Sequence, residues 1–350
     1  MAYKRSFTAI LLSGVQTVLA PREPSASHGL HRQLDHRGQI TCDEMFLYLV
    51  ALVALFLIYR WLKELRTVPN KEDKYVYVTG CDSGFGNQLV RHLDKLGYRV
   101  IAGCYTQKGE DELKKNTSDK LTTLHLDVTD TASVTKAVDV IKSLVGNKGL
   151  WALVNNAGVS VPAGSTDWLT IEDYRACWLV LPLIKKAKGR VVNVASVFGR
   201  ISPIGGAYCI SKFGVEAFND SLRINMAPFG VKVCCIEPGF FSTNVTQTDL
   251  IGTNMKRVWD RLPQDVKDDY GHDFCNKAVA KMKTSLLCDR DLMKVVHSME
   301  HAISAVYPRK RYSPGYDAKL LWLPLSYMPS CVADWCFKRY NIKLKIESSN

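Results

Sequence analysis

The stretch YVYVTGCDSGFG, at residues 75–86, decides how the rest of the chain can fold. Its first five residues are β-branched or aromatic and predict a short strand. Apolar residues then recur at helical spacing, at Phe85, Leu89, Leu93 and Leu96. A strand, a glycine turn and a helix predict a dinucleotide site, because glycines let the backbone approach a pyrophosphate and the helix start offers N–H groups. The predicted cofactor contacts in this turn are Gly80, Ser83, Gly84, Phe85 and Gly86.

Further strand-like runs alternate with helical segments along the chain, at 98–104, 121–128, 151–155 and 190–195. This alternation predicts an α/β fold: a Rossmann-like, doubly wound parallel sheet with helices on both faces. Ligands of such sheets bind at the carboxyl ends of the strands, where Gly80, Asp127 and Asn155 fall.

The end of the second strand distinguishes NAD from NADP in this fold, because an acidic residue there holds the ribose hydroxyls of NAD. Here the run at 99–106 reads RVIAGCYT, with no acid at its end and no arginine beside it, although Lys108 is near. The residues themselves leave the choice between NAD and NADP open.

A serine, a tyrosine and a lysine follow the fifth strand. Ser196 stands at its carboxyl end, and Tyr208 and Lys212 lie four residues apart in AYCISKFGVEAF. On a helix these two share a face, and the ammonium favours the phenolate by lowering a pKa that is ordinarily about 10. Tyr208 can then exchange a proton with an alcohol while hydride passes to a nicotinamide, with Ser196 bonded to the reacting oxygen. We predict these three as catalytic residues, although each alone is more often an ordinary surface or core residue.

From about Met45 onward the chain resembles the short-chain dehydrogenase/reductase family. Five motifs occur in order: TGxxxGxG at 79–86, NNAG at 155–158, Ser196, YxxxK at 208–212, and PG at 238–239 with Thr243. The wording GCDSGFG, GLWALVNNAG and YDAKLLWLPLSYMP is similar to the microsomal retinol dehydrogenases and the 17-beta and 3-alpha hydroxysteroid dehydrogenases.

The resemblance implies an enzyme that interconverts a hydrophobic alcohol, a retinoid or a steroid, with its carbonyl. It implies Tyr208 as proton donor and acceptor, and Lys212 as its activator and a ribose ligand. Members of this subgroup commonly prefer NAD, so the resemblance favours NAD without excluding NADP. Around the cofactor it further implies Asp127, Asn155, Ala157, Gly158, Pro238, Gly239 and Thr243, together with Tyr208 and Lys212.

The crossover between Gly158 and Arg190 departs from the family pattern. Family members keep a long helix there, with a catalytic asparagine that holds a proton-relay water, and many also use this helix at a dimer interface. Here about a dozen residues are missing, roughly 18 Å of helix, and no asparagine lies between Asn156 and Asn193. We also expect Pro182 to break the helix that remains. The alternative to an active enzyme is therefore a catalytically impaired member with a nucleotide-binding or interaction role.

The segment before the glycine turn predicts a membrane anchor over 45–62, because MFLYLVALVALFLIY has no polar face. Its C-terminal flank carries the positive charges Arg60, Lys63, Arg66, Lys71 and Lys74, which favour a cytosolic main domain. The resemblance to microsomal dehydrogenases implies that this membrane is the endoplasmic reticulum. Residues 63–74 are assigned as a polar linker, and residues 1–44 as an unassigned, disordered extension.

The remaining chain is predicted to form one dehydrogenase domain over 75–320, with a substrate lid at about 244–300. Residues 321–350 form an apolar C-terminal segment and tail. The formal net charge of +12 raises the question of nucleic-acid binding, but no block of like charge stands out, so we expect no nucleic-acid partner. Eleven cysteines without zinc spacing indicate buried thiols and no metal. The expected partners are a small hydrophobic substrate, a membrane and, as a possibility left open, a second copy of the chain.

Overall fold

The computed structural model describes residues 42–158, 172–203, 207–243, 248–271, 273–285 and 288–340. Most of the predicted extension over 1–44 therefore lies outside the described residues. The chain divides into two units, 1–58 and 59–350, and each is taken by itself below.

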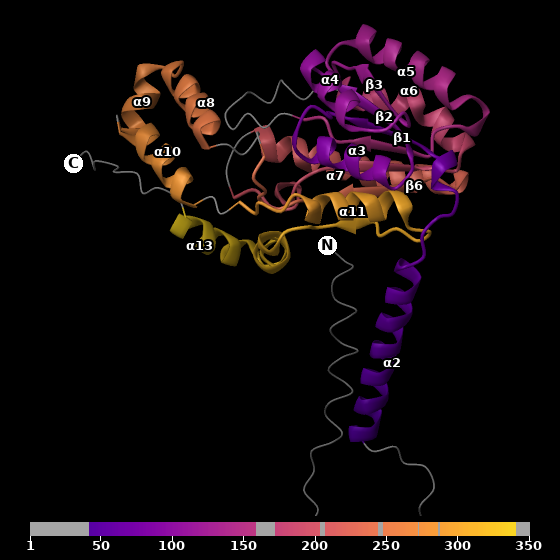
Figure 1. Ribbon diagram of the computed structural model, residues 1–350. Coiled ribbons are helices and arrows are strands. Elements are labelled where there is room, and N and C mark those ends of the chain that lie inside the picture. The colour runs from indigo at the N-terminus through magenta and orange to yellow at the C-terminus, as the bar shows by residue number, and fades with distance from the viewer. Residues whose placement is uncertain are drawn as a thin grey trace, which may run out of the picture. The chain divides into compact units, whose positions relative to one another are not determined.

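A parallel sheet organises the second unit (Figure 1). Its seven described strands lie in the order β3-β2-β1-β4-β5-β6-β7, and every neighbouring pair is parallel. The chain runs outward from β1 in one direction and from β4 in the other, which confirms the predicted doubly wound fold. The strands are β1 (Tyr75–Thr79), β2 (Arg99–Cys104), β3 (Leu121–His125), β4 (Ala152–Asn155), β5 (Arg190–Val194), β6 (Lys232–Ile236) and β7 (Arg311–Tyr312).

Both faces of the sheet are buried, which explains why its strands are almost continuously apolar. In β1, Val76 and Val78 belong to one core cluster and Tyr77 to the other. Figure 1 shows α3 and α11 against one face and α5 and α6 against the other. The first cluster is completed by residues of α3 (Gly84–Lys95), α4 (Gln107–Asn116) and α11 (Met293–Ser304), and the second by residues of α5 (Thr131–Val145), α6 (Glu172–Lys186) and α7 (Ala207–Met226).

The shortened crossover contains α6, and Pro182 lies inside this helix. The prediction that Pro182 breaks the helix was wrong. A proline removes one backbone hydrogen bond, but burial of Val180, Leu181 and Ile184 in the second core cluster stabilises the helix around it. Residues 159–171, where the crossover begins, lie outside the described residues.

In the described part of the chain, three further helices lie between β6 and α11: α8 (Thr248–Asp260), α9 (Gln264–Tyr270) and α10 (Phe274–Ser285). Rings of Trp259, Tyr270 and Phe274 pack together and join them. The last part of the predicted lid falls in α11, where Val295, Val296 and Met299 are fully buried in the main core. After β7 come η7 (Ala318–Trp322), α12 (Leu323–Ser326) and α13 (Ser330–Tyr340), and the short turns are η1 (Lys71–Asp73), η2 (Gly146–Lys148), η4 (Val197–Gly199) and η5 (Ala227–Phe229).

Helix α2 (Cys42–Glu64) contains the predicted anchor. Within the described residues it is the one helix that is long and apolar enough to cross a membrane, judged by length and composition. Past its end, the predicted linker is fastened to the body: Val68 N–H donates to Ser304 O at 2.8 Å, and Val306 N–H donates to Arg66 O at 2.8 Å.

Candidate active site

The glycine turn between β1 and α3 leaves no room for side chains. A Cβ atom on Gly80 would lie 2.7 Å from the Cα of Ala157, and Gly80 has a φ of +70°. A Cβ on Gly86 would lie 2.6 Å from Asn156 Nδ2 and closer still to the Gly80 carbonyl. The turn therefore packs directly against the NNAG segment that follows β4, and both glycines are required by close approach of the backbone.

Gly84 is constrained differently. Its φ is +63°, and a Cβ there would make only ordinary contact with Thr243 at 3.8 Å, so its backbone conformation and not crowding by described residues favours glycine. Ser83 occupies the N-cap and makes no side-chain capping bond, which leaves the helix start to an external acceptor. Phe85 turns the other way and packs edge-to-face on Phe241 at 5.7 Å. An open, positively polarised helix start is what the pyrophosphate of a dinucleotide requires, so the residues fit that group.

Two residues that the sequence-based assignment omitted hold this turn in place. Asn156 donates through Nδ2 to the carbonyls of Thr79 and Gly80, both at 3.0 Å. The Thr79 hydroxyl accepts from the N–H groups of Asn156 and Ala157 at 3.1 and 3.0 Å. Asn156 belongs to the NNAG motif, so the motif itself contained the signal.

A third omitted residue, Asp82, connects the glycine turn to the end of β2. Its carboxylate accepts from the N–H of Tyr105 at 2.8 Å and from the N–H and hydroxyl of Thr106 at 2.8 and 2.6 Å. Burial acts to raise the pKa of Asp82, but these hydrogen bonds outweigh it and the pKa is lowered. The end of β2, which has no acid of its own, therefore has the Asp82 carboxylate of the glycine turn beside its backbone.

The remaining predicted residues of the nucleotide half lie at the same edge of the sheet. Asp127 follows β3, and its carboxylate accepts from the N–H and hydroxyl of Thr129, which lower its pKa. Asn155 ends β4 and donates to Asn193 Oδ1 of β5 at 2.8 Å. Among the described residues, a Cβ added to Gly158 would meet only Asn156 O, at 4.0 Å.

The structure brings the three predicted catalytic residues together. Ser196, at the end of β5, is buried and hydrogen-bonds to Tyr208. Lys212 Nζ lies 5.8 Å from the centre of the Tyr208 ring and donates to Val194 O at 3.2 Å. Burial raises the pKa of Tyr208 above its ordinary value, and the bond from Ser196 lowers it only in part. The lowering by Lys212 that the sequence predicts is therefore wrong for this arrangement, in which burial is the largest effect.

The PG segment after β6 lies between these two halves of the site. Pro238 O accepts from Val197 N–H at 3.0 Å, which fixes it to the turn that follows Ser196. Gly239 donates to Pro314 O at 3.0 Å, and a Cβ on it would collide with the carboxylate of Asp317. Thr243 is the residue nearest to the open side of Gly84. This segment therefore joins the catalytic turn to the glycine turn.

An apolar cluster covers Tyr208 on the side of the C-terminal segment. Phe198, Phe240 and Trp322 pack edge-to-face with ring centroids 5.3–6.2 Å apart, and Tyr208 packs against the same cluster. Leu320 and Tyr327 of that segment stay largely exposed, at 76% and 73%. The segment is therefore partly core and partly a free apolar surface.

The comparisons with known proteins agree with this geometry. A profile of the short chain dehydrogenase family matches residues 74–251. Retinol dehydrogenase 7 of Rattus norvegicus is 48% identical over 303 residues, covering 83% of this chain and 96% of that protein. The 17-beta-hydroxysteroid dehydrogenase type 6 of Bos taurus is 46% identical over 308 residues, covering 84% and 97%.

This chain belongs to the short-chain dehydrogenase family. It is a nicotinamide-dependent oxidoreductase that interconverts an alcohol and its carbonyl. Among solved structures, a short chain dehydrogenase/reductase from Burkholderia phymatum in complex with NAD has a TM-score of 0.57 at 19% identity, covering 73% of this chain and 94% of that one. At this identity the likeness shows the fold alone. The comparisons give no support to the alternative of a catalytically impaired member.

Proposed function

We propose that this protein is a membrane-anchored, NAD-dependent dehydrogenase of retinoids or hydroxysteroids, with Tyr208 as its acid–base residue. The observation that carries the proposal is the arrangement of buried Ser196 and half-buried Tyr208 and Lys212 beside an aromatic cluster. The substrate class follows from relatives named retinol dehydrogenase and 17-beta-hydroxysteroid dehydrogenase. An apolar wall beside the reacting hydroxyl suits either alcohol.

Each residue of the constellation has a distinct task in the proposed reaction. A bound nicotinamide supplies the acceptor or donor of the hydride. Tyr208 takes the proton of the substrate hydroxyl during oxidation and returns it during reduction. Ser196, which already hydrogen-bonds Tyr208, would hold the substrate oxygen. The Lys212 ammonium, 5.8 Å from the centre of the Tyr208 ring, would favour the phenolate by its charge.

The preference for NAD is supported by Asp82. Its carboxylate lies at the backbone of Tyr105 and Thr106, where the predicted adenosine ribose would follow β2. A 2′-phosphate at that place would meet a negative charge, whereas the two free hydroxyls of NAD would meet a hydrogen-bond acceptor.

We also propose a membrane location and an orientation for the chain. Helix α2 would span the endoplasmic reticulum membrane, and the basic residues from Arg60 to Lys74 would keep the catalytic body cytosolic. Within the predicted lid at about 244–300, helices α8, α9 and α10 would cover the substrate. Protease protection in microsomes tests the orientation, and cross-linking in detergent tests whether the chain forms a homodimer.

Turnover by the full-length chain in lipid nanodiscs tests the proposed reaction. We expect NAD-linked oxidation of all-trans-retinol or of a 3α-hydroxysteroid, and weaker activity with NADP. A chain that binds NADH but turns over none of these alcohols contradicts the proposal and favours the impaired alternative. A matched version with about a dozen crossover residues restored would then show whether the shortened helix is the cause.

A further inference from the structure

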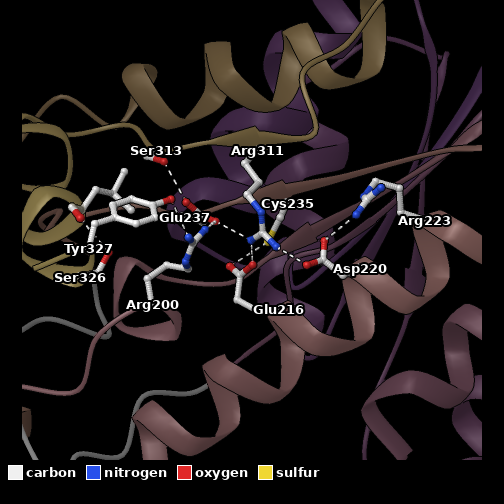
Figure 2. A network of polar contacts seen from close by, with 11 residues as sticks. Arg200, Glu216, Asp220, Arg223, Cys235, Glu237, Arg311, Ser313, Ser326 and Tyr327 are labelled. Atoms are coloured by element: carbon white, nitrogen blue, oxygen red, sulfur yellow. Dashed lines mark hydrogen bonds and ion pairs between the residues drawn. The ribbon is translucent and has the colours of Figure 1, made fainter. Parts of the chain in front are cut away.

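A network of charged side chains lies behind the catalytic residues and joins four separate parts of the chain (Figure 2). Its centre is the guanidinium of Arg311, on the edge strand β7. Nη1 of Arg311 lies 2.7 Å from Glu237 Oε1 and also contacts Glu216, and Nη2 lies 2.7 Å from Asp220 Oδ2. One side chain therefore ties helix α7 to the end of strand β6.

The α7 partners of Arg311 lie on the face of the helix that carries the predicted catalytic residues. Tyr208, Lys212, Glu216 and Asp220 follow one another at intervals of four residues, so they form one stripe along α7. Any rotation or sliding of α7 that moved Glu216 and Asp220 away from Arg311 would move Tyr208 and Lys212 with them.

The β6 partner leads to the other side of the site. Glu237 is 1% exposed and stands directly before Pro238 and Gly239, which lie against the turn after Ser196. Ser313 donates to its Oε2 at 2.9 Å. Burial raises the pKa of Glu237, while the Ser313 hydroxyl and the charge of Arg200 act in the opposite direction.

Arg200 joins this network from the turn that follows Ser196. Its Nη1 lies 3.3 Å from Glu237 Oε1, and its Nη2 donates to the Tyr327 hydroxyl at 2.7 Å. Figure 2 shows Arg200 and Arg311 approaching Glu237 together. Thus the guanidinium groups of Arg200 and Arg311 connect four elements. These are the turn after Ser196, helix α7, the PG segment and the C-terminal apolar segment.

Two simpler explanations of this network fall short. Glu216, Cys235 and Glu237 have the spacing of metal ligands, but the Arg311 guanidinium already lies between the two carboxylates. Global stability is also a weak reason, since buried ion pairs lose in desolvation much of what they gain in attraction. Their better-attested use is to select one arrangement of packed elements over its neighbours.

We propose that Arg311 is a positioning residue of the reaction: it sets the register of α7 against β6 and so places Tyr208 and Lys212 opposite the PG segment. The inference rests on the proposed function for the roles of Tyr208 and Lys212. It adds a residue 99 positions away from Lys212 to the machinery that the family motifs define.

The first experiment compares Arg311→Gln and Arg311→Lys in the full-length chain, with Arg309→Gln as the matched control. Arg309 lies two residues away and pairs with Glu64 from an exposed position, so its loss should leave kcat unchanged. For Arg311→Gln we expect kcat to fall about 100-fold, the cost of a misplacement of about 1 Å at the reacting atoms. Arg311→Lys keeps the positive charge but not the several N–H donors of the planar guanidinium group, so its kcat should lie between those of Arg311→Gln and wild type.

The pH profile separates positioning from folding. Removing a positive charge beside Glu216 and Glu237 makes the surroundings of Tyr208 more negative and disfavours the phenolate. In the plot of kcat for alcohol oxidation against pH, the rise that reports ionisation of Tyr208 should therefore move to higher pH in Arg311→Gln. It should stay in place in Arg311→Lys. Loss of active enzyme in proportion to loss of folded protein, with an unmoved limb, would overturn the proposal.

Tyr327→Phe provides a test without risk to the fold, because it removes only the hydroxyl that accepts from Arg200. We expect kcat to fall about twofold to fivefold, the loss of one partly exposed hydrogen bond to a charge, with an unchanged melting temperature. If kcat is unchanged both in this variant and in Arg311→Gln, the positioning role of the network is refuted.

NADH binding keeps this proposal separate from the proposed function. If the wild-type chain oxidises neither retinol nor a hydroxysteroid, the substrate assignment fails, but Lys212 still serves as ribose ligand. Arg311→Gln should then bind NADH at least about tenfold more weakly than wild type, as expected for a displaced charged hydrogen bond, and Arg309→Gln should bind normally. Equal NADH affinity in all three proteins would contradict the positioning role.

Discussion

The two edges of the active site are built by different means. The glycine turn is held by uncharged groups close to it, since Thr79, Asn156 and Ala157 bond to the turn or pack on it through backbone and amide atoms. The catalytic helix is held from behind by charges, with Arg311 and Arg200 reaching it or its neighbours from distant segments. On the proposed function, the cofactor would then be positioned by close approach of the backbone and Tyr208 by ion pairs between residues distant in sequence.

Tyr208→Phe tests the catalytic edge most strongly. Removing the hydroxyl removes the proposed proton acceptor while keeping the ring in the aromatic cluster, so turnover should fall by about 10³–10⁴-fold, at the upper end for general acid–base catalysis. NADH binding, measured by its fluorescence, should change little because the glycine turn is untouched. Residual turnover near the wild-type rate would remove Tyr208 from its proposed role.

Ser196→Ala tests the same edge through pH. The Ser196 bond lowers the pKa of Tyr208 against the effect of burial, so its loss should raise that pKa. Alcohol oxidation needs the phenolate, and the limb of kcat should therefore move to higher pH. At neutral pH we expect a fall of about 10²–10³-fold, comparable to the loss of one oxyanion-hole donor. A fall in kcat without any movement of the limb would show that Ser196 does not tune Tyr208.

How much of each edge could be predicted from sequence follows from how local its contacts are. The glycine turn, the sheet and the Ser196, Tyr208 and Lys212 constellation follow from short motifs and hydrophobic periodicity, and the structure places them together. Arg311 has no such signal, because its partners lie between 74 and 95 residues away along the chain. Pro182 failed as a helix breaker for a related reason, since tertiary packing of its neighbours outweighs a local preference.

Gly86→Ala tests the cofactor edge. A single methyl group would press on the Gly80 carbonyl and on Asn156 Nδ2, neither of which can retreat without opening the turn. We expect a loss of about 1–3 kcal/mol in stability, typical of overpacking, and a marked rise in the Kd for NADH. Gly158→Ala is the matched comparison for packing, because among the described residues a Cβ there meets nothing nearer than 4.0 Å. Thermal denaturation and NADH titration of the two variants check this, and equal behaviour would show that backbone approach does not shape the turn.

Asp82→Asn gives the smallest expected effect. It tests the one contribution of a charged side chain to the glycine turn described above, because Asp82 holds the backbone after β2 through its carboxylate. Asparagine keeps an oxygen for one of the N–H groups of Tyr105 and Thr106 but removes the charge. Removing the repulsion of a 2′-phosphate should shift the ratio of kcat/KM for NAD over NADP by about tenfold toward NADP, the effect of roughly 1.4 kcal/mol. Because the carboxylate also fastens the loop after β2, a rise in KM for both cofactors without a change in their ratio would assign Asp82 a purely structural role. A shift in the ratio with little loss for NAD would instead make Asp82 the replacement for the acid that β2 lacks.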